Sequence, residues 1–106
     1  MNKLAGFQRK YLRGLAHELK PVVMIGKSGL TDAVHAMIDQ ALTDHELIKI
    51  KFVDFKDEKE VLSLDIATKS KSENVGGIGN IVIFYRQQED IKKRKIKIPV
   101  KQQTGE

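Results

Sequence analysis

The spacing of apolar residues changes from a helical period to a period of two, and back again, within 106 residues. The chain opens with a helical stripe whose members step by three or four positions, namely Leu4, Phe7, Tyr11, Leu15 and Leu19. Leu12 and Ala16 lie beside the stripe, so we expect it to face the core. Pro21 should end this helix, because the residue before a proline is driven out of the α region.

A short strand, a glycine turn and a second helix are predicted next. The apolar residues 22–25 indicate a strand buried on both faces, and the segment 26–29 interrupts it. Thr31 is the expected N-cap of the following helix, with Asp32 favourable in its first turn. This helix should turn an apolar stripe toward the core, made of Val34, Met37, Ile38, Ala41 and Leu42.

From Leu47 onward, apolar residues alternate along the chain, and residues 47–53 predict a half-buried strand. Residues 54–72 allow two interpretations. Alternation of Leu62, Leu64 and Ile66 fits a strand, whereas the spacing of Glu58, Leu62, Ile66 and Lys69 fits a helix. The length of the connection favours the helix, because joining parallel strands takes a dozen or more residues.

Residues 75–78 and 81–85 predict a hairpin whose turn, Gly79-Asn80, needs positive φ. Gly76 and Gly77 are unusually small for its first strand. Residues 95–101 alternate in a pattern that fits a sheet edge, where Pro99 is tolerated. The expected order is therefore α-β-α-β-α-β-β, one compact α/β domain in which a four-stranded mixed sheet packs with helices.

Length and composition exclude several classes of protein. A chain of 106 residues, 41% hydrophobic and 31% charged, is expected to form one soluble domain. Its longest apolar runs are far too short to span a bilayer, so no membrane partner is expected. The absence of cysteine excludes disulfides and thiolate metal sites. The first residues lack the features of a secretory signal, and the cytoplasm is the expected compartment.

Basic residues gather toward the two ends of the chain. The net charge is +5 over residues 1–30, −4 over 31–60, zero over 61–85 and +4 over 86–106. Two basic segments around a neutral-to-acidic centre are typical of a surface that binds a polyanion. Charge alone is equally compatible with an ordinary solvated surface.

The segment Gly26-Lys27-Ser28-Gly29 lies between a predicted strand and a predicted helix N-terminus. Unpaired backbone N–H groups and the positive end of the helix dipole suit a phosphate there, and Lys27 and Ser28 add a charge and a donor. A plain turn is the alternative interpretation. A Walker A motif would need glycine where Pro21 stands, which argues against an NTPase.

The residues offer little for catalysis. His17, His35 and His45 are scattered, and no metal-ligand set, cofactor motif or nucleophile elbow accompanies them. We therefore expect neither an enzyme nor a small-molecule substrate, and no cofactor. Most of the six aromatic residues lie on predicted core stripes, so no exposed stacking platform is expected and binding should depend on phosphates and shape.

Several short segments together resemble the YhbY family, stand-alone bacterial versions of the CRM (chloroplast RNA splicing and ribosome maturation) domain. These are Leu15-Ala16-His17, Leu19-Lys20-Pro21-Val22-Val23, Ile25-Gly26-Lys27, Gly29-Leu30-Thr31, Glu46-Leu47-Ile48-Lys49, Ile78-Gly79 and Tyr85-Arg86. The resemblance covers about residues 4 to 100. It implies a fold similar to the C-terminal domain of bacterial translation initiation factor three, and a helix in residues 54–72.

The resemblance also implies a non-enzymatic protein that binds RNA and associates with precursors of the large ribosomal subunit. The expected partners are rRNA and the precursor of the large ribosomal subunit. The RNA-binding domain is expected to comprise residues 1–90, and to bind rRNA phosphates through a GxxG loop and a basic first helix. A basic extension, 91–106, is expected to be partly ordered against the domain. The expected RNA-binding residues are Arg9, Lys10, Arg13, His17, Lys20, Gly26, Lys27, Ser28, Gly29, Lys92, Lys93 and Arg94.

Two other hypotheses stay open from the residues alone. An adaptor could dock on ribosomal proteins or assembly factors through the acidic segment from Asp54 to Glu60. A phosphate-ester hydrolase using the glycine loop is the least favoured, because no base or metal site accompanies the loop.

Overall fold

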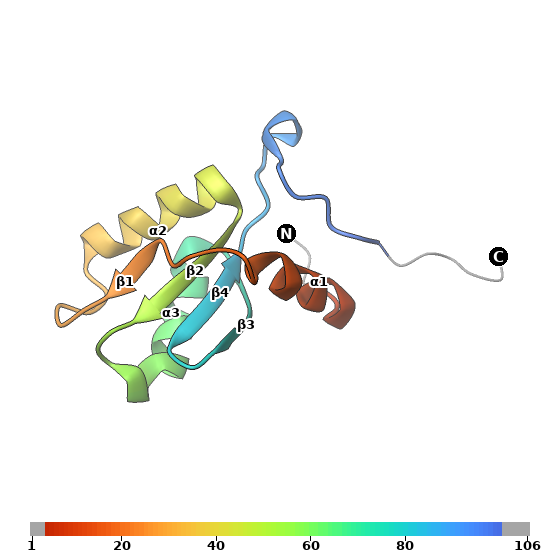
Figure 1. Ribbon diagram of the computed structural model, residues 1–106. Coiled ribbons are helices and arrows are strands. Elements are labelled where there is room, and N and C mark those ends of the chain that lie inside the picture. The colour runs from red at the N-terminus through yellow and green to blue at the C-terminus, as the bar shows by residue number, and fades with distance from the viewer. Residues whose placement is uncertain (1–3, 101–106) are drawn as a thin grey trace.

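A computed structural model describes residues 4–100, in which helices lie on both faces of a four-stranded mixed sheet (Figure 1). The end of the predicted extension, residues 101–106, lies outside the described residues. The elements are α1 (Gly6–Ala16), β1 (Val23–Ile25), α2 (Asp32–His45), β2 (Leu47–Phe52), η1 (Lys56–Glu58), α3 (Lys59–Ser70), β3 (Glu73–Ile78), β4 (Ile81–Tyr85) and η2 (Ile91–Lys93). The predicted fold class is confirmed, and residues 59–70 are helical.

The sheet has the strand order β1-β2-β4-β3. β1 runs parallel to β2, while β4 runs antiparallel to both of its neighbours. The predicted hairpin forms, with Gly79 at a φ of 58° in its turn and a bulge between Asn74 and Gly76. The turn therefore has the chemistry expected of a two-residue hairpin connection.

One face of the sheet is covered by α2 and α3, which bury the larger hydrophobic core between them and the strands. Thr31 caps α2 as predicted, since its Oγ1 accepts a hydrogen bond from the Val34 N–H at 3.1 Å. Ile38 and Leu42 are fully buried, and Val34 packs at the edge of this core. The prediction for Met37 was wrong: its side chain is exposed, because it lies at the outer margin of the stripe.

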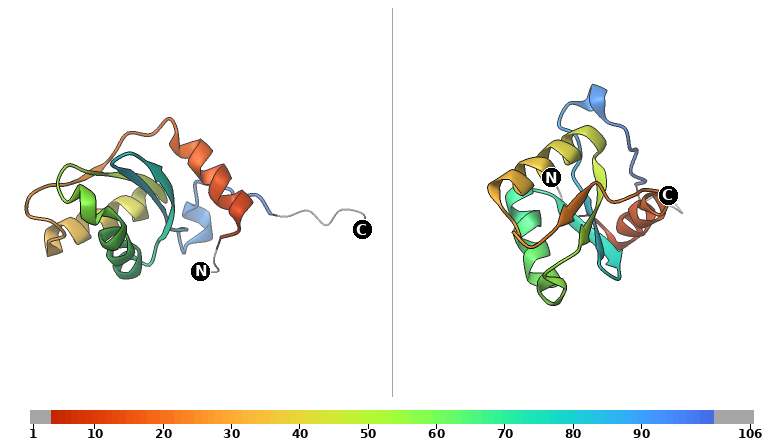
Figure 2. Two further views of the ribbon diagram at one scale, coloured as in Figure 1. Left: turned by 90° about the horizontal axis from the view of Figure 1, so that it is seen from below. Right: turned by 60° about the vertical axis from the view of Figure 1, so that its left-hand side comes forward.

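The opposite face of the sheet carries α1 and the C-terminal segment (Figure 2, left). A second core forms there, made of Leu4, Leu12, Ala16, Leu47, Val75, Ile83 and Tyr85, with Ile96 and Ile98 packed against it. Ile96 and Ile98 therefore contribute side chains to a core, whereas the sequence predicted a strand at the sheet edge. Residues 94–100 form no strand, and the Pro99 carbonyl accepts a hydrogen bond from the Gln8 side chain at 3.0 Å.

The predicted core stripe of the first helix is only partly correct. Leu12 and Ala16 are fully buried, but Phe7, Tyr11 and Leu15 are each about 40% exposed. Only a narrow side of α1 contacts the sheet, so the neighbouring side, which carries these three residues, extends beyond the sheet into solvent. Leu19 lies beyond the helix, which ends at Ala16 rather than at the proline.

The prediction that β1 is buried on both faces was also wrong. Val23 and Ile25 point into the larger core, whereas Met24 is 59% exposed. The physical reason is that α1 contacts β2, β3 and β4 but covers only one end of that sheet face. The other end, at the start of β4, stays open.

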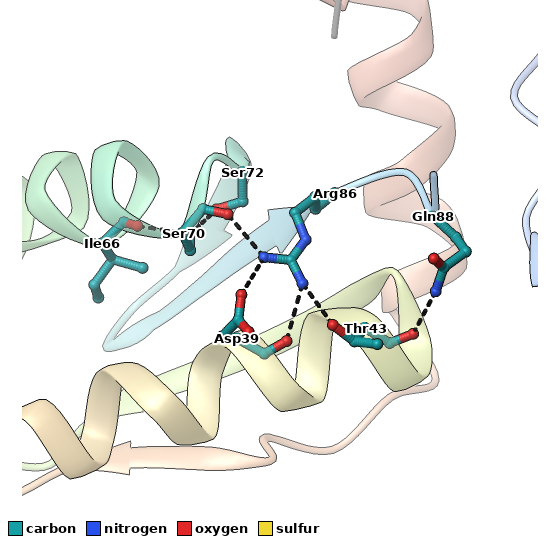
Figure 3. A network of polar contacts seen from close by, with 7 residues as sticks. All are labelled: Asp39, Thr43, Ile66, Ser70, Ser72, Arg86 and Gln88. Atoms are coloured by element: carbon teal, nitrogen blue, oxygen red, sulfur yellow. Dashed lines mark hydrogen bonds and ion pairs between the residues drawn. The ribbon is translucent and has the colours of Figure 1, made fainter. Parts of the chain in front are cut away.

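Arg86 ties three elements together at the end of β4 (Figure 3). Its guanidinium donates to the Asp39 carboxylate at 2.6 Å, to the Thr43 hydroxyl at 2.8 Å and to the Ser70 carbonyl at 2.9 Å. These bonds join the middle of α2, the last residue of α3 and the chain leaving the sheet. Arg86 thus stabilises the fold, because several of its N–H donors already form hydrogen bonds within the protein.

Glu46 fastens the C-terminal segment to the domain. Its carboxylate is 1% exposed and accepts three backbone N–H groups, from Gln88 at 2.8 Å, Lys95 at 2.8 Å and Ile96 at 2.9 Å. Bonds of this kind satisfy a charge that would otherwise be costly to bury. One side chain, directly before β2, therefore anchors the backbone of residues 88–96 at three points.

Tyr85 should make the fold sensitive to alkali. Burial, and secondarily the Glu46 carboxylate, raise the pKa of its hydroxyl from 10.0 to about 12, although Arg94 acts in the opposite direction. A folded-state pKa above the unfolded one gives stability that is complete below pH 10 and is lost as pH rises from 10 to about 12. At pH 11 we expect a loss of about 1.4 kcal/mol, measured by denaturant unfolding.

The matched control is Tyr85→Phe, which removes a hydroxyl that has no hydrogen-bond partner among the described residues. This variant should be at least as stable as the wild type at pH 7 and should lose less stability between pH 9 and 11. Equal alkaline losses in the two proteins would show that other groups, such as the lysines, cause the effect.

Candidate functional site

The loop from Gly26 to Gly29 joins the end of β1 to the capped start of α2. It closes on itself through a bond from the Gly29 N–H to the Gly26 carbonyl at 2.9 Å, while Lys27 and Ser28 are exposed at its tip. Gly29 has a φ of 69°, a conformation that favours glycine. A lysine and a hydroxyl are thus held at the mouth of a helix, where an anion is favoured.

Gly26 differs from Gly29, because nothing in the described fold requires it to be glycine. Its φ is not in the left-handed region, and a Cβ added there would meet no atom within 4 Å. A side chain at position 26 would therefore cause no clash within the protein when no ligand is bound. The missing side chain leaves the loop backbone open to close approach by a ligand.

Beside the loop lies the uncovered end of the sheet. Paired residues of the four strands form one row across it, on the face that carries α1: Met24, Lys51, Ile81 and Ile78. Three strand spacings make this row about 14 Å wide. Met24, Lys51 and Ile78 are exposed, with Lys51 at the centre. The row is therefore a shallow apolar surface with a central cation.

Two of the predicted basic residues of α1 are used by the fold. Arg9 donates to the Leu4 carbonyl at 2.6 Å and pairs with Glu73 at 3.5 Å. Arg13 donates to the Val75 carbonyl at 2.9 Å and lies across Gly76, where a Cβ would come within 2.5 Å of the arginine Cδ. This contact and a φ of 139°, which favours glycine, together explain why the strand carries glycine at position 76.

Arg13 and the loop border the same surface from different sides. Met24 precedes the loop by two residues at one end of the uncovered row, and Arg13 covers Gly76, next to Ile78 at the other end. The loop and α1 are thus separated by the width of the open sheet (Figure 1). Lys10 and His17 are exposed on the helix side that faces away from Leu12.

The remaining predicted residues lie elsewhere. Lys20 follows α1 and lines a groove of about 500 Å³ together with Leu19, His45 and Lys95. Lys92 and Lys93 belong to η2, and the Arg94 side chain donates to the Gln88 carbonyl at 2.7 Å. This basic cluster is far from the glycine loop (Figure 1), so the structure does not join it to the surface beside the loop.

Lys51 and three partly exposed aromatic side chains were not among the residues predicted from the sequence. Alternation along β2 puts Lys49 and Lys51 on the face away from the larger core, a signal that could have identified the lysine surface. The expectation that most aromatic residues lie in the core holds for Phe52, Phe84 and Tyr85 only. Phe7 and Tyr11 are half-exposed on α1, and Phe55 is half-exposed beside the glycine loop.

The described residues show no group of three His, Cys, Asp or Glu side chains that could hold a metal ion. His35 pairs with Asp65 at 3.6 Å, which is a two-residue contact between α2 and α3. Among residues 4–100, no helix combines the length and the apolar character needed to cross a bilayer.

Comparisons with known proteins give a consistent result. The model of the CRS1/YhbY (CRM) domain family matches residues 4–86. An "RNA-binding protein" of Haemophilus influenzae is 41% identical over 102 residues, which cover 95% of this chain and all of that protein. The "Probable RNA-binding protein YqeI" of Bacillus subtilis is 32% identical over 97 residues, covering 91% of this chain and 99% of YqeI.

A solved structure agrees with this result. The solution structure of the hypothetical protein SAV1595 from Staphylococcus aureus superposes with a TM-score of 0.75 at 34% sequence identity. The match covers 92% of this chain and all of that one. The similarity therefore extends over nearly the whole chain.

Proposed function

The chain belongs to the CRS1/YhbY (CRM) domain family, and from this premise we propose that it binds RNA through the glycine loop and the adjoining open end of the sheet. Its proposed partner is rRNA within precursors of the large ribosomal subunit, in the cytoplasm. The proposal assigns the protein no catalytic step. It holds structured RNA mainly by its phosphates.

The observation that carries this proposal is the surface beside the loop. Lys27 and Ser28 are exposed at a helix mouth, Lys51 stands at the centre of the uncovered row, and Gly26 leaves the loop backbone accessible. Phosphate binding requires accessible donors and cations, and the surface offers both. The RNA-binding relatives support the same partner class.

Salt dependence tests the electrostatic part of the proposal. If about six phosphates are neutralised, the logarithm of the affinity should fall against the logarithm of the salt concentration with a slope of about −4 to −5. Binding to an rRNA fragment would be measured by titration at several salt concentrations. An affinity that did not change with salt would contradict phosphate binding.

Charge reversal tests where the RNA lies. Lys27→Glu and Lys51→Glu should each weaken RNA binding by about tenfold, since each removes a phosphate contact and adds repulsion. Lys69→Glu is the control, because Lys69 is exposed on α3 and pairs there with Asp65. Equal losses in all three variants would point to net charge rather than to this surface. Arg13 is unsuitable for the test, because its side chain supports β3.

A further inference from the structure

Phe55 has an unusual backbone conformation next to the glycine loop. Its φ and ψ are 58° and 34°, in the left-handed region that a bulky residue rarely adopts. A residue held there costs roughly 1 kcal/mol or more, and such conformations cluster at functional sites. The side chain is nevertheless 39% exposed, so packing does not account fully for a phenylalanine at this position.

Backbone hydrogen bonds hold Phe55 next to the loop. The N–H groups of Val53 and Asp54 both donate to the Ile25 carbonyl at 3.0 Å, which joins the chain after β2 to the end of β1. A Cβ at Gly29 would lie 3.5 Å from Cε2 of the Phe55 ring. One edge of the ring therefore rests against the loop, and the ring remains accessible beside it.

The charges around the ring are divided. Lys27 is exposed on the loop, whereas η1, which begins directly after Phe55, carries the exposed side chains of Lys56, Asp57 and Glu58 and so has a net charge of −1. A phosphate is therefore favoured near the loop more than near η1, where two carboxylates outnumber one ammonium group. Between the loop and η1, the ring of Phe55 can bind an uncharged, planar group. A nucleobase is such a group, and in RNA it is attached to a backbone of phosphates.

We propose that Phe55 stacks on an unpaired base of the RNA whose backbone lies on the Gly26–Gly29 loop. This inference rests on the proposed function and narrows its substrate class. The site takes RNA that has an unpaired nucleotide, in a loop, bulge or single strand, because a paired base offers no free face to a side chain.

Phe55→Leu separates stacking from packing, because leucine keeps an apolar contact with Gly29 but has no aromatic face. We expect this variant to bind a single-stranded oligonucleotide about tenfold more weakly than the wild type, and to bind a fully paired duplex equally well. Phe55→Tyr should retain wild-type affinity for both. Lys27→Glu should weaken both, since it acts on the phosphates.

Fluorescence gives a direct readout of the stacked base. The chain contains no tryptophan, so Phe55→Trp introduces a single indole at the site. Its emission should be quenched by the single-stranded oligonucleotide and should not change with an abasic strand of the same length. Quenching by the abasic strand to the same extent would overturn the stacking role.

The outcomes distinguish this inference from the proposed function. If Phe55→Leu binds single strands as tightly as the wild type while Lys27→Glu does not, the RNA site stands and the role of Phe55 is wrong. If the wild type binds neither RNA, the proposed function itself fails. Phe55→Gly controls for folding, because glycine accepts the positive φ without strain and should keep the fold while losing the single-strand preference.

Discussion

Replacing Glu46 with alanine is expected to lower the free energy of unfolding by about 4 kcal/mol and to release the C-terminal segment from the domain. The carboxylate is buried and accepts three backbone N–H groups from residues 88–96. Hydrogen bonds to a charged group contribute about 1.5–3 kcal/mol each, and losing them together leaves the donors unpaired or sends them into water. The second core also loses the cover that Ile96 and Ile98 provide.

The measurement is denaturant unfolding together with amide hydrogen exchange at Gln88, Lys95 and Ile96. Exchange at these amides should become faster, while the β2–β4 pairing keeps its protection. Glu46 has a φ of 65°, which is unfavourable for alanine as well as for glutamate. The substitution therefore removes the carboxylate without relieving backbone strain.

Two variants serve as controls for the Glu46 prediction. Glu46→Gln should show an intermediate loss, since its carbonyl can accept two of the bonds while its amide opposes the third donor. Glu89→Ala, in an exposed residue of the same segment, should change stability by less than about 0.5 kcal/mol. Unchanged exchange at Lys95 and Ile96 in Glu46→Ala would mean that the apolar contacts alone hold the segment.

Gly77→Ala is the second substitution with a large expected effect. A Cβ at this position would overlap the carbonyl oxygen of Ile81, which belongs to the backbone of the paired strand. Because a backbone atom cannot move aside as a flexible side chain does, the β3–β4 hairpin must shift. We expect a loss of about 3 kcal/mol in the free energy of unfolding, at the upper end of what overpacking costs.

Gly26→Ala is the matched control, since the same change at Gly26 meets no atom within 4 Å and no positive φ. Its stability should stay within about 0.5 kcal/mol of the wild type. Both variants would be compared by denaturant unfolding under one set of conditions. Similar stabilities of the two variants would contradict the role of the Ile81 contact, because the effect of Gly→Ala on the unfolded chain is stabilising at both positions.

Local features of the fold could be predicted from the sequence. The Thr31 cap, the positive φ at Gly79 and the end of β1 before Gly26 follow from side-chain chemistry within a few residues. The segment 54–72 was ambiguous because its apolar residues fit both periods; the length of the connection favoured a helix, and the family resemblance implied one.

The candidate site was less predictable, because it depends on what each side chain touches. Arg9 and Arg13 have the spacing of a basic helix face, yet they contact Glu73 and Val75, more than 60 residues away in sequence. Lys51 and Phe55 gave no motif, and their importance comes from lying beside the loop. Alternation along β2 indicates the sheet face on which Lys51 lies, but the sheet brings these residues beside the loop, and no local pattern predicts that.

The sequence by itself determined where most of the helices, strands and turns form, because backbone preference and side-chain period act over a few residues. Only the tertiary structure decided which flank of α1 is buried and which part of the sheet stays open. Burial depends on the size and position of the partner surface. Here α1 covers one end of a sheet face, leaving Met24 and Lys51 uncovered beside the glycine loop.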